Sequence, residues 1–359
     1  MEQINNTTAM LDLINHSAFC VKDGIVLGTN QAARQHTITE GTAIADLLLT
    51  GSREYSEFSG GCLYLTLNLS GTPFGASVTR TNGLDIFILE QEEDQSELQA
   101  MALAAQELRQ PLTSIMTVAD HLFPLTESQW DPDLQDQVAR INRGLFQMLR
   151  IISNMSDAYR YSHDTPTRQE TRDISGILDE IFQSTAPLVA HAGLQLNYTG
   201  LTESVFGLVD AEKLERAVNN ILSNALKFSP TGGSIDAKLT RKGTMLYLTV
   251  QNGSSGIEDD IRKNIFNRFR REPGIEDGRY GIGLGMVLLR AAAAVHGGTV
   301  LIEQDAQLGT RITMTISIRQ SSETVVHSHV LRVDYAGERN HGLLELSESL
   351  PASLYQKES

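Results

Sequence analysis

Two asparagines and a lysine in the segment NNILSNALKFSPTGG have side chains and a spacing that could do chemistry. Asn220 and Asn224 are four residues apart, which puts both on one face of a helix, and Lys227 follows one turn further on. A carboxamide oxygen can ligate Mg²⁺, and a lysine ammonium can contact phosphate oxygens. The spacing therefore indicates a helix that presents a magnesium and phosphate site along one side.

A second candidate site lies in the segment GIGLGM, where Gly281, Gly283 and Gly285 come just before a predicted helix. Bare backbone amides and a helix N-terminus suit an anion. A glycine pattern alone is weak evidence, and an amide-rich helix is ordinary on its own. Between the two segments, VQNGSSGIEDDIRKNIFNRF carries a turn followed by Phe266 and Phe269. The three segments in this order are much stronger evidence than any one of them.

The elements around these segments alternate between helical and strand patterns from residue 166 to 319, as in an α/β sandwich. A helix is expected in DISGILDEIFQSTAPLVAHAG, and a long amphipathic helix in DAEKLERAVNNILSNALKFS is capped by Asp210. Strands are expected in SIDAKLTRK, MLYLTVQN, TVLIEQD and TRITMTISI, and a further helix in MVLLRAAAAVHGG. Residues 320–359 form a C-terminal extension with weak strand character around VLRVDY.

Upstream, residues 91–165 carry apolar side chains at alternating spacings of three and four, the pattern of a coiled-coil seam. The connector FPLTESQWDPD separates two such seams. Two helices joined in this way form an antiparallel hairpin, and two seams with little else to cover them dimerise into a four-helix bundle, so we expect a homodimer. The seam members are Leu98, Met101, Ala105, Leu108, Leu112, Ile115, Ala119 and Leu122, then Leu134, Val138, Ile141, Leu145, Met148, Ile152, Met155 and Tyr159.

Residues 1–90 combine a helical start, AMLDLIN, with strand-like runs separated by Gly and Asn, which predicts a small α+β module. The strand-like runs are AFCVKDGIVLGTN, GCLYLTLNLS, FGASVTR and LDIFILE. The whole chain is thus predicted to be a multidomain α+β protein with an N-terminal module, a helical hairpin, an α/β sandwich and a C-terminal extension.

Composition excludes several classes of protein. With 359 residues the chain is too long for one core, which rarely grows past about 250 residues. No run approaches the roughly 18 apolar residues of a membrane span, and the N-terminus lacks the features of a secretory signal, so we expect a cytoplasmic protein. The net charge of −15 opposes nucleic acid binding. Cys20 and Cys62 have no metal-type spacing and are expected to be filler thiols.

The three segments that carry chemistry resemble the sensor histidine kinases of two-component signalling. NNILSNALKF is similar to the N box of that family, IFNRFRR to its F box and GIGLGM to its second glycine box. The resemblance covers residues 95–318 and implies a four-helix dimerisation and phosphoacceptor domain followed by a Bergerat-type ATP-binding domain. Residues 1–90 also resemble a PAS sensory domain, more faintly, through FCVKDGIVLGTNQAA and the later strands.

The resemblance implies roles for the residues of the ATP site. Asn224 is implied to hold the Mg²⁺ that bridges the phosphates of ATP, and Asn220 and Lys227 to line the site. Gly281, Gly283 and Gly285 belong to the second glycine box. The loop REPGIEDGRYGIGLG is implied to close over the nucleotide as a lid.

The first glycine box, D-x-G-x-G in the family, is altered in this chain. Asn252 replaces the aspartate that accepts a hydrogen bond from the adenine amino group, Ser254 replaces the first glycine, and Gly256 is retained. Asparagine still offers an acceptor oxygen, but charge-assisted hydrogen bonds are roughly twice as strong as neutral ones. Ser254 adds a side chain where the backbone must approach closely. We therefore expect ATP binding to be weakened rather than abolished.

The phosphoacceptor motif departs further. The family reads H-E-L-R-T-P-L, and this chain reads QELRQPL, so Gln106 stands where the acceptor histidine is expected and Glu107 follows it. An imidazole nitrogen can attack the γ-phosphoryl group, whereas a carboxamide cannot, because its lone pair is delocalised into the carbonyl. His121 lies about 22 Å further along the helix and lacks the following acid, which makes it a poor substitute.

Gln110 has a functional interpretation of its own. The family places a phosphatase motif after the histidine, an acid followed three residues later by Thr or Asn that positions a water; Glu107 and Gln110 occupy these places. A glutamine amide can orient a water towards an aspartyl phosphate. The seam register turns Gln106 and Gln110 outward, so two solvated glutamines are the structural alternative.

Three functions remain open on the sequence, besides a nucleotide-binding protein unrelated to signalling. The first is a pseudokinase that cannot autophosphorylate, binds ATP and Mg²⁺ weakly, and regulates a response regulator or another histidine kinase by docking. The second is a response-regulator phosphatase that uses Gln110. The third is an active sensor histidine kinase with an unrecognised acceptor.

Overall fold

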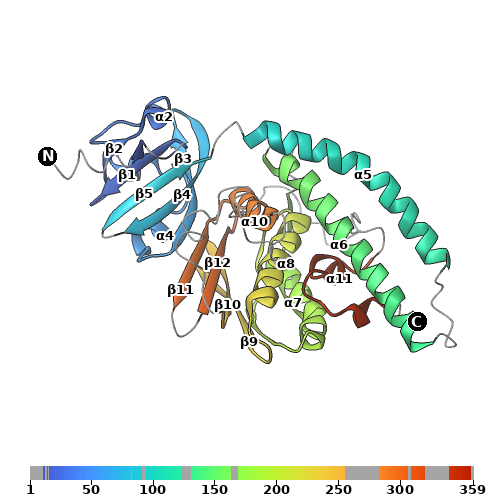
Figure 1. Cartoon of the computed structure of the whole chain (residues 1–359). Coiled ribbons are helices and arrows are strands. Elements are labelled where there is room, and N and C mark those ends of the chain that lie inside the picture. Colours follow the sequence, from blue (N-terminus) through green and yellow to red (C-terminus); the bar gives the residue numbers. More distant parts are fainter. Residues whose placement is uncertain are drawn as a thin grey trace.

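The computed structural model describes residues 11–12, 14, 16–81, 83–90, 94–122, 131–162, 169–254, 283–305, 309–319 and 339–356. The described elements form a long helical hairpin, an α/β sandwich beside it and a small β-rich module (Figure 1). No helix in this part of the chain is long and apolar enough to cross a membrane. Most of AMLDLIN, most of the lid loop, Phe266, Phe269 and the VLRVDY strand lie outside the described residues.

The α/β sandwich predicted for residues 166–319 is present. Its strands are hydrogen-bonded in the order β11-β12-β10-β9-β7, with β7 parallel to β9 and the other pairs antiparallel. A separate two-stranded sheet pairs β6 with β8. The strands are β6 (Glu170–Asp173), β7 (Gln195–Thr199), β8 (Phe206–Val209), β9 (Ser234–Lys242), β10 (Met245–Asn252), β11 (Val300–Asp305) and β12 (Gly309–Ser317), and the helices are α7 (Ile174–His191), α8 (Ala211–Phe228) and α10 (Leu284–Val295).

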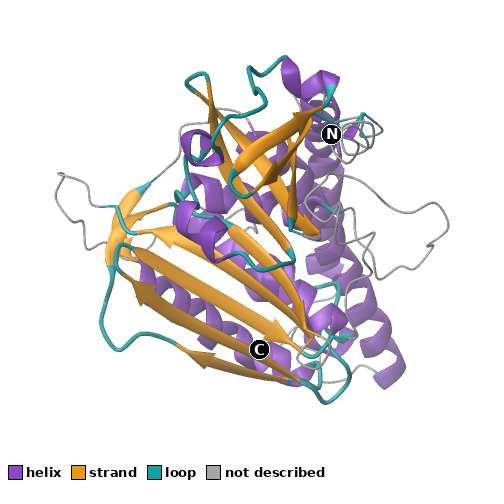
Figure 2. Cartoon of the chain, turned by 90° about the vertical axis from the view of Figure 1, so that its left-hand side faces the viewer, coloured by secondary structure: helices purple, strands orange, loops and turns teal. Residues whose placement is uncertain are grey.

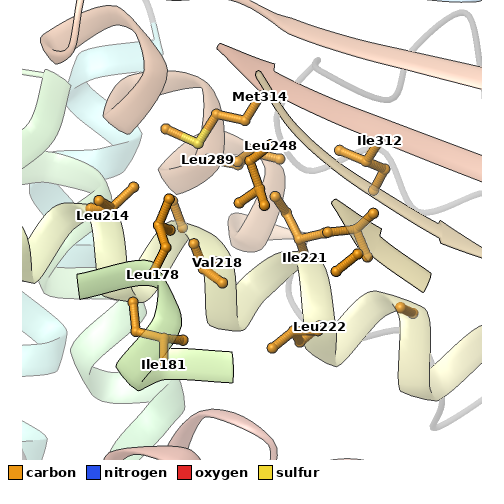
Figure 3. Close-up of a cluster of buried hydrophobic side chains, with 14 of the residues drawn as sticks. Leu178, Ile181, Leu214, Val218, Ile221, Leu222, Leu248, Leu289, Ile312 and Met314 are labelled. Atoms are coloured by element: carbon orange, nitrogen blue, oxygen red, sulfur yellow. The ribbon is translucent and has the colours of Figure 1, made fainter. Parts of the chain in front are cut away.

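The helix that carries the candidate asparagines is fixed by its cap and by its apolar face. The side chain of Asp210 accepts a hydrogen bond from the Lys213 amide at 3.2 Å, which confirms the predicted N-cap of α8. The inner face of α8 packs between α7, α10 and the sheet (Figure 3). Its contributors to this core include Leu214, Val218, Ile221 and Leu222.

The hairpin consists of α5 (Asp94–Leu122) and α6 (Pro132–Ser162), which run side by side. The predicted seam is divided between two surfaces. Ala105, Leu112 and Ala119 are buried in one cluster with Leu145 and Ile152 of α6, and Val138 of α6 is also buried. The alternate seam members are exposed on the outside of the hairpin; they are Leu108, Ile115, Leu122, Leu134, Ile141 and Met148. The hairpin thus covers one half of its seam and leaves the other half as an apolar stripe.

The N-terminal module, residues 16–90, contains an antiparallel sheet in the order β2-β1-β5-β4-β3. Its core is built from alternating side chains of these strands and includes the stacked rings of Phe19 and Phe87. The strands are β1 (Ala18–Lys22), β2 (Ile25–Thr29), β3 (Cys62–Leu69), β4 (Thr72–Thr81) and β5 (Leu84–Leu89), and the helices between β2 and β3 are α2 (Gln31–Arg34), α3 (Ile44–Leu47) and α4 (Ser52–Glu57). These strands lie where the sequence predicts them.

The two sheets join edge to edge, which the sequence analysis did not anticipate. β3 pairs antiparallel with β11, so that one ten-stranded sheet runs through the module and the sandwich (Figure 2). Because side chains alternate along a strand, Cys62 and Tyr64 enter the core of the sandwich while Leu63 stays in the core of the module. At one end of the junction Arg290 pairs with Glu90 at 2.6 Å, and at another the Tyr247 hydroxyl donates to Glu54 at 2.8 Å.

A segment near the C-terminus also packs against the helices of the hairpin and the sandwich. The C-terminal segment, residues 339–356, contains the short helix α11 (His341–Glu345) and the 3-10 turn η1 (Ala352–Tyr355). It packs against α6, α7 and α8 (Figure 1). The side chain of Asn340 caps α11 by accepting from the Leu343 amide at 3.0 Å. The sequence of this part of the extension predicts no packed element.

A substitution at Gly61, the residue directly before β3, tests whether the two sheets pair. A Cβ there would overlap the carbonyl oxygen of Ile302 in β11, whereas a Cβ at Gly71 would meet nothing within 4 Å. Both glycines have positive φ, so Gly71→Ala measures the conformational strain alone, about 1–2 kcal/mol. We expect Gly61→Ala to lose about 1–3 kcal/mol more through the overlap.

The measurement is urea unfolding combined with hydrogen exchange of residues 299–303. Exchange in this segment should accelerate in Gly61→Ala and stay as in the wild type in Gly71→Ala. Equal exchange in the two variants would mean that β3 and β11 do not pair in solution.

Candidate functional site

The polar residues of α8 that the sequence singled out lie along one side of the helix. Asn220 is buried; its Nδ2 donates to the Arg216 carbonyl at 2.9 Å. Asn224 is half-buried and donates to the thioether sulfur of Met286 in α10 at 3.7 Å. A thioether is a weak acceptor, so this carboxamide can turn towards a cation at small cost. Lys227 is paired with Glu348 of the C-terminal segment at 3.3 Å.

The first turn of α10 faces the asparagines of α8. Gly283 is the N-cap of α10 with a φ of 79°, which favours glycine. A Cβ on Gly285 would lie 3.0 Å from Asn220 Oδ1, so a larger residue would crowd the asparagine. The structure therefore brings Gly285 next to Asn220, and Met286 next to Asn224, at the junction of two helices. Gly281 and Gly256 lie outside the described residues.

Asn252, at the end of β10, is buried beside the C-terminal turn of α8. Its Nδ2 donates to Ser229 Oγ at 3.2 Å and lies 3.5 Å from the Ala225 carbonyl oxygen. These two acceptors hold the amide nitrogen towards α8, and Oδ1 is the atom of this side chain that can accept a bond from a ligand. Ser254 Oγ shares a 2.6 Å hydrogen bond with Thr310 Oγ1, which anchors the substituted serine to β12.

Arg216 and Arg150 form a buried charged cluster next to these residues, which the sequence analysis missed. Arg216 of α8 pairs with Asp157 of α6 and, at 3.2 Å, with Glu345 of the C-terminal segment. Arg150 of α6 donates to Ser223 Oγ at 3.1 Å and lies 3.5 Å from Asn220 Oδ1. The hairpin and the sandwich are thus held together by charges directly beside the candidate site. Arginine at positions that a helical pattern makes inward was the one available signal.

The acceptor segment is a solvent-exposed face of α5. Gln106, Glu107 and Gln110 are all exposed, with Glu107 and Gln110 three residues apart. α5 continues through Pro111, and the hydroxyls of Thr113 and Ser114 donate to the carbonyls of Arg109 and Gln110 at 2.8 and 3.1 Å. The face is therefore regular helix that a partner can reach.

His296 supports the start of α8 from inside the sandwich. Its Nε2 accepts from the Asp210 amide at 3.1 Å, and its Nδ1 lies 2.7 Å from the Ala292 carbonyl, to which it donates in this tautomer. Burial lowers the pKa of this imidazole below its usual value, against smaller opposing effects of the Ala292 bond and Asp210. The folded structure therefore favours the neutral imidazole, whose Nε2 can accept the bond from the Asp210 amide.

Two family models match the chain. Residues 96–163 match the His Kinase A (phospho-acceptor) domain, and residues 209–320 match the histidine kinase-, DNA gyrase B-, and HSP90-like ATPase. The first range contains the hairpin and Gln106, and the second contains α8, β10 and α10. Fold and site together define a phosphoacceptor-type hairpin followed by an ATP-binding domain.

Curated relatives of the chain are named as sensor histidine kinases. The chain is 27% identical to the sensor histidine kinase CusS of Escherichia coli (strain K12) over 59% of its length, and 27% identical to WalK of Bacillus subtilis (strain 168) over 66%. It spans 44% and 39% of the lengths of these two relatives. Among solved structures, full-length ShkA in complex with AMPPNP aligns with 62% of the chain at 18% identity and a TM-score of 0.49. The chain belongs to the sensor histidine kinases of two-component signalling.

Asn252→Asp tests the assignment of Asn252 to the adenine amino group. A carboxylate oxygen accepts a charge-assisted hydrogen bond, so we expect affinity for Mg-ADP to rise about fivefold. The same change loses the donor to Ser229 and Ala225, which should lower the free energy of unfolding by about 1 kcal/mol. Isothermal titration calorimetry and urea unfolding measure the two effects separately. If the affinity does not change, Asn252 does not contact the adenine.

The buried neutral His296 predicts a pH dependence of stability. Because its pKa in the folded protein lies below the ordinary 6.5, its contribution is complete above pH 6.5 and is lost as the pH falls towards the folded pKa. The loss has a limiting slope of about 1.4 kcal/mol per pH unit. In His296→Gln this part of the slope should disappear. Urea unfolding at several pH values between about 5 and 8 measures it; identical slopes in wild type and variant would exclude a neutral buried imidazole.

Proposed function

We propose that this chain is a pseudokinase of the histidine kinase family, which binds Mg-ATP weakly and regulates a response regulator or a partner kinase by docking. The observation that carries the proposal is Gln106, which stands in the acceptor motif on an exposed face of α5. A carboxamide nitrogen has no available lone pair with which to attack a phosphoryl group. The substitution removes the nucleophile and leaves the surface around it intact.

The nucleotide would bind where α8 and α10 meet. Asn224 would hold Mg²⁺, which neutralises charge on the phosphates when it is bound. Lys227 would contact phosphate oxygens, and the N-terminus of α10 at Gly283 would face the same anion. Asn252 would accept a neutral hydrogen bond from the adenine amino group, weaker than the bond to an aspartate. These features support binding that is weak rather than absent.

Dimerisation is supported by the uncovered half of the seam. Leu108 and Ile115 are 50% and 54% exposed, although they continue the same heptad pattern as Leu112, which is 5% exposed. The exposed seam residues of α6, Leu134, Ile141 and Met148, continue this apolar surface on the second helix, and such a surface is typical of an interaction site. A second copy would cover it in a four-helix bundle, and a related kinase with a similar seam would fit as well.

The N-terminal module would supply the input. Its resemblance to a PAS sensory domain is faint in sequence, and its five-stranded antiparallel sheet with three short helices after β2 is compatible with it. Its direct strand pairing with the ATP-binding domain supports a role in controlling that domain.

A phosphatase of response regulators is the second candidate. Glu107 and Gln110 are both exposed and lie one turn apart, so that an incoming aspartyl phosphate could reach the Gln110 amide. A glutamine in this position can orient a water for attack on the phosphorus without the acceptor histidine.

Incubation with γ-labelled Mg-ATP tests the principal proposal. The wild-type chain should form no acid-labile protein phosphate, because position 106 lacks an imidazole. Gln106→His should restore labelling if the nucleotide site is competent, and Gln106→Ala is the matched control. Label on the wild type that survives Gln106→Ala and vanishes in His121→Ala would instead identify an active kinase with another acceptor.

Loss of phosphate from a phosphorylated response regulator separates docking from phosphatase activity. Under the pseudokinase proposal the regulator loses phosphate at its own rate when the chain is added. Acceleration that Gln110→Ala cancels would establish the phosphatase instead.

A further inference from the structure

The C-terminal segment occupies a site that is built to receive it. Leu344 and Leu346 are buried, the first among the apolar side chains of the hairpin and the second in the core of the sandwich. From α6, Arg143 and Gln147 donate to the carbonyl of Ser347 at 3.1 and 3.0 Å. The segment is therefore held against the hairpin and the sandwich by both apolar and polar contacts.

Two carboxylates of this segment reach the cations beside the nucleotide site. Glu345 is fully buried and lies 3.2 Å from Arg216 and 3.4 Å from Arg150. Glu348, 27% exposed at the rim, lies 3.2 Å from Arg150 and 3.3 Å from Lys227. Glu345 anchors the segment, and Glu348 extends from the anchor to the residue that the proposed function assigns to phosphate.

Four polar residues of α8 define where the C-terminal segment and the nucleotide would overlap. Arg216, Asn220, Ser223 and Lys227 follow one another at spacings of four, three and four, which places them on one stripe of the helix. Arg150 links this stripe to the segment, because the same guanidinium contacts Asn220, Ser223, Glu345 and Glu348. A carboxylate bound to Lys227 and Arg150 and a phosphate bound to Lys227 compete for the same donors.

We propose that residues 339–356 act as an intramolecular competitor of the nucleotide, in which Glu348 takes the place of a phosphate on Lys227. The proposal rests on the proposed function, because it assumes that nucleotide binds along α8. Phosphate and carboxylate both offer anionic oxygens to the same cations. With Glu348 on Lys227, nucleotide must displace a bonded partner. Its apparent affinity is then reduced by the fraction of molecules in which the segment is docked.

The Glu348→Gln variant measures this competition. It removes the negative charge at the rim and leaves the buried anchor Glu345 in place, so the fold is retained. We expect affinity for Mg-ADP, measured by calorimetry on the 359-residue chain, to rise about three- to tenfold. Glu303→Gln is the matched control, because Glu303 is another partly exposed glutamate of the same domain, paired with Arg311 at 3.7 Å. The control should bind Mg-ADP as the wild type does.

Hydrogen exchange of residues 343–350 distinguishes displacement from simple charge repulsion. Binding of Mg-ADP to the wild type should accelerate exchange in this segment, since competition is reciprocal.

The outcomes separate this inference from the proposed function. Mg-ADP binding that is equal in wild type and Glu348→Gln, or binding that leaves residues 343–350 protected, overturns the competition and leaves the nucleotide site standing. Absence of Mg-ADP binding in every full-length form, Glu348→Gln and Asn252→Asp included, overturns both.

Discussion

The neutralisation of Arg216 is the constraint on which the arrangement of the whole molecule depends. This guanidinium lies on the side of α8 that faces away from the core of the sandwich, and it is fully buried against the hairpin and the C-terminal segment. A buried charge is tolerated only with partners, and loss of one partner from such a pair typically costs about 3–5 kcal/mol. Its carboxylates come from Asp157 of the hairpin and Glu345 of the C-terminal segment. Three segments far apart in the sequence must therefore meet at one helix before that helix can be buried.

α8 is for this reason buried on two sides. Its apolar side, with Leu214 and Val218, belongs to the core of the sandwich, and its polar side faces the hairpin and the C-terminal segment. Asn220 lies on the polar side of α8 beside Arg150, and Asn224 contacts Met286 of α10. Both belong to a helix whose start is fixed by Asp210 and His296.

Sequence reasoning succeeded where the signal is local. The capping side chain of Asp210, the alternation in Met245–Asn252 and the seam spacing of the hairpin each depend on neighbouring residues, and the corresponding elements lie where they were expected. It could not foresee the pairing of β3 with β11, because an edge strand that meets another domain has the same alternation as one that meets water. Glu345 and Glu348 likewise look like surface charges in LLELSESL. Their role depends on ion pairs with arginines such as Arg150 and Arg216, which are more than a hundred residues away in the sequence. Of the candidate glycines, Gly285 lies beside Asn220, and Gly283 caps the same helix.

Two contacts were not predicted from the sequence: the pairing of β3 with β11, and the ion pairs of the C-terminal segment with Lys227 and Arg150. They differ in the kind of interaction that links them to the candidate site. The N-terminal module reaches the candidate site through backbone pairing: β3 is bonded to β11, β11 to β12, and β12 to β10, in which Asn252 pairs with Thr310. The C-terminal segment reaches it through charge at Lys227 and Arg150, and its partly exposed member Glu348 is open to screening by salt. Backbone hydrogen bonds carry no net charge and are not screened in this way. The module therefore connects to the strand that carries Asn252, and the C-terminal segment to Lys227, by two separate structural routes that differ in their response to ionic strength.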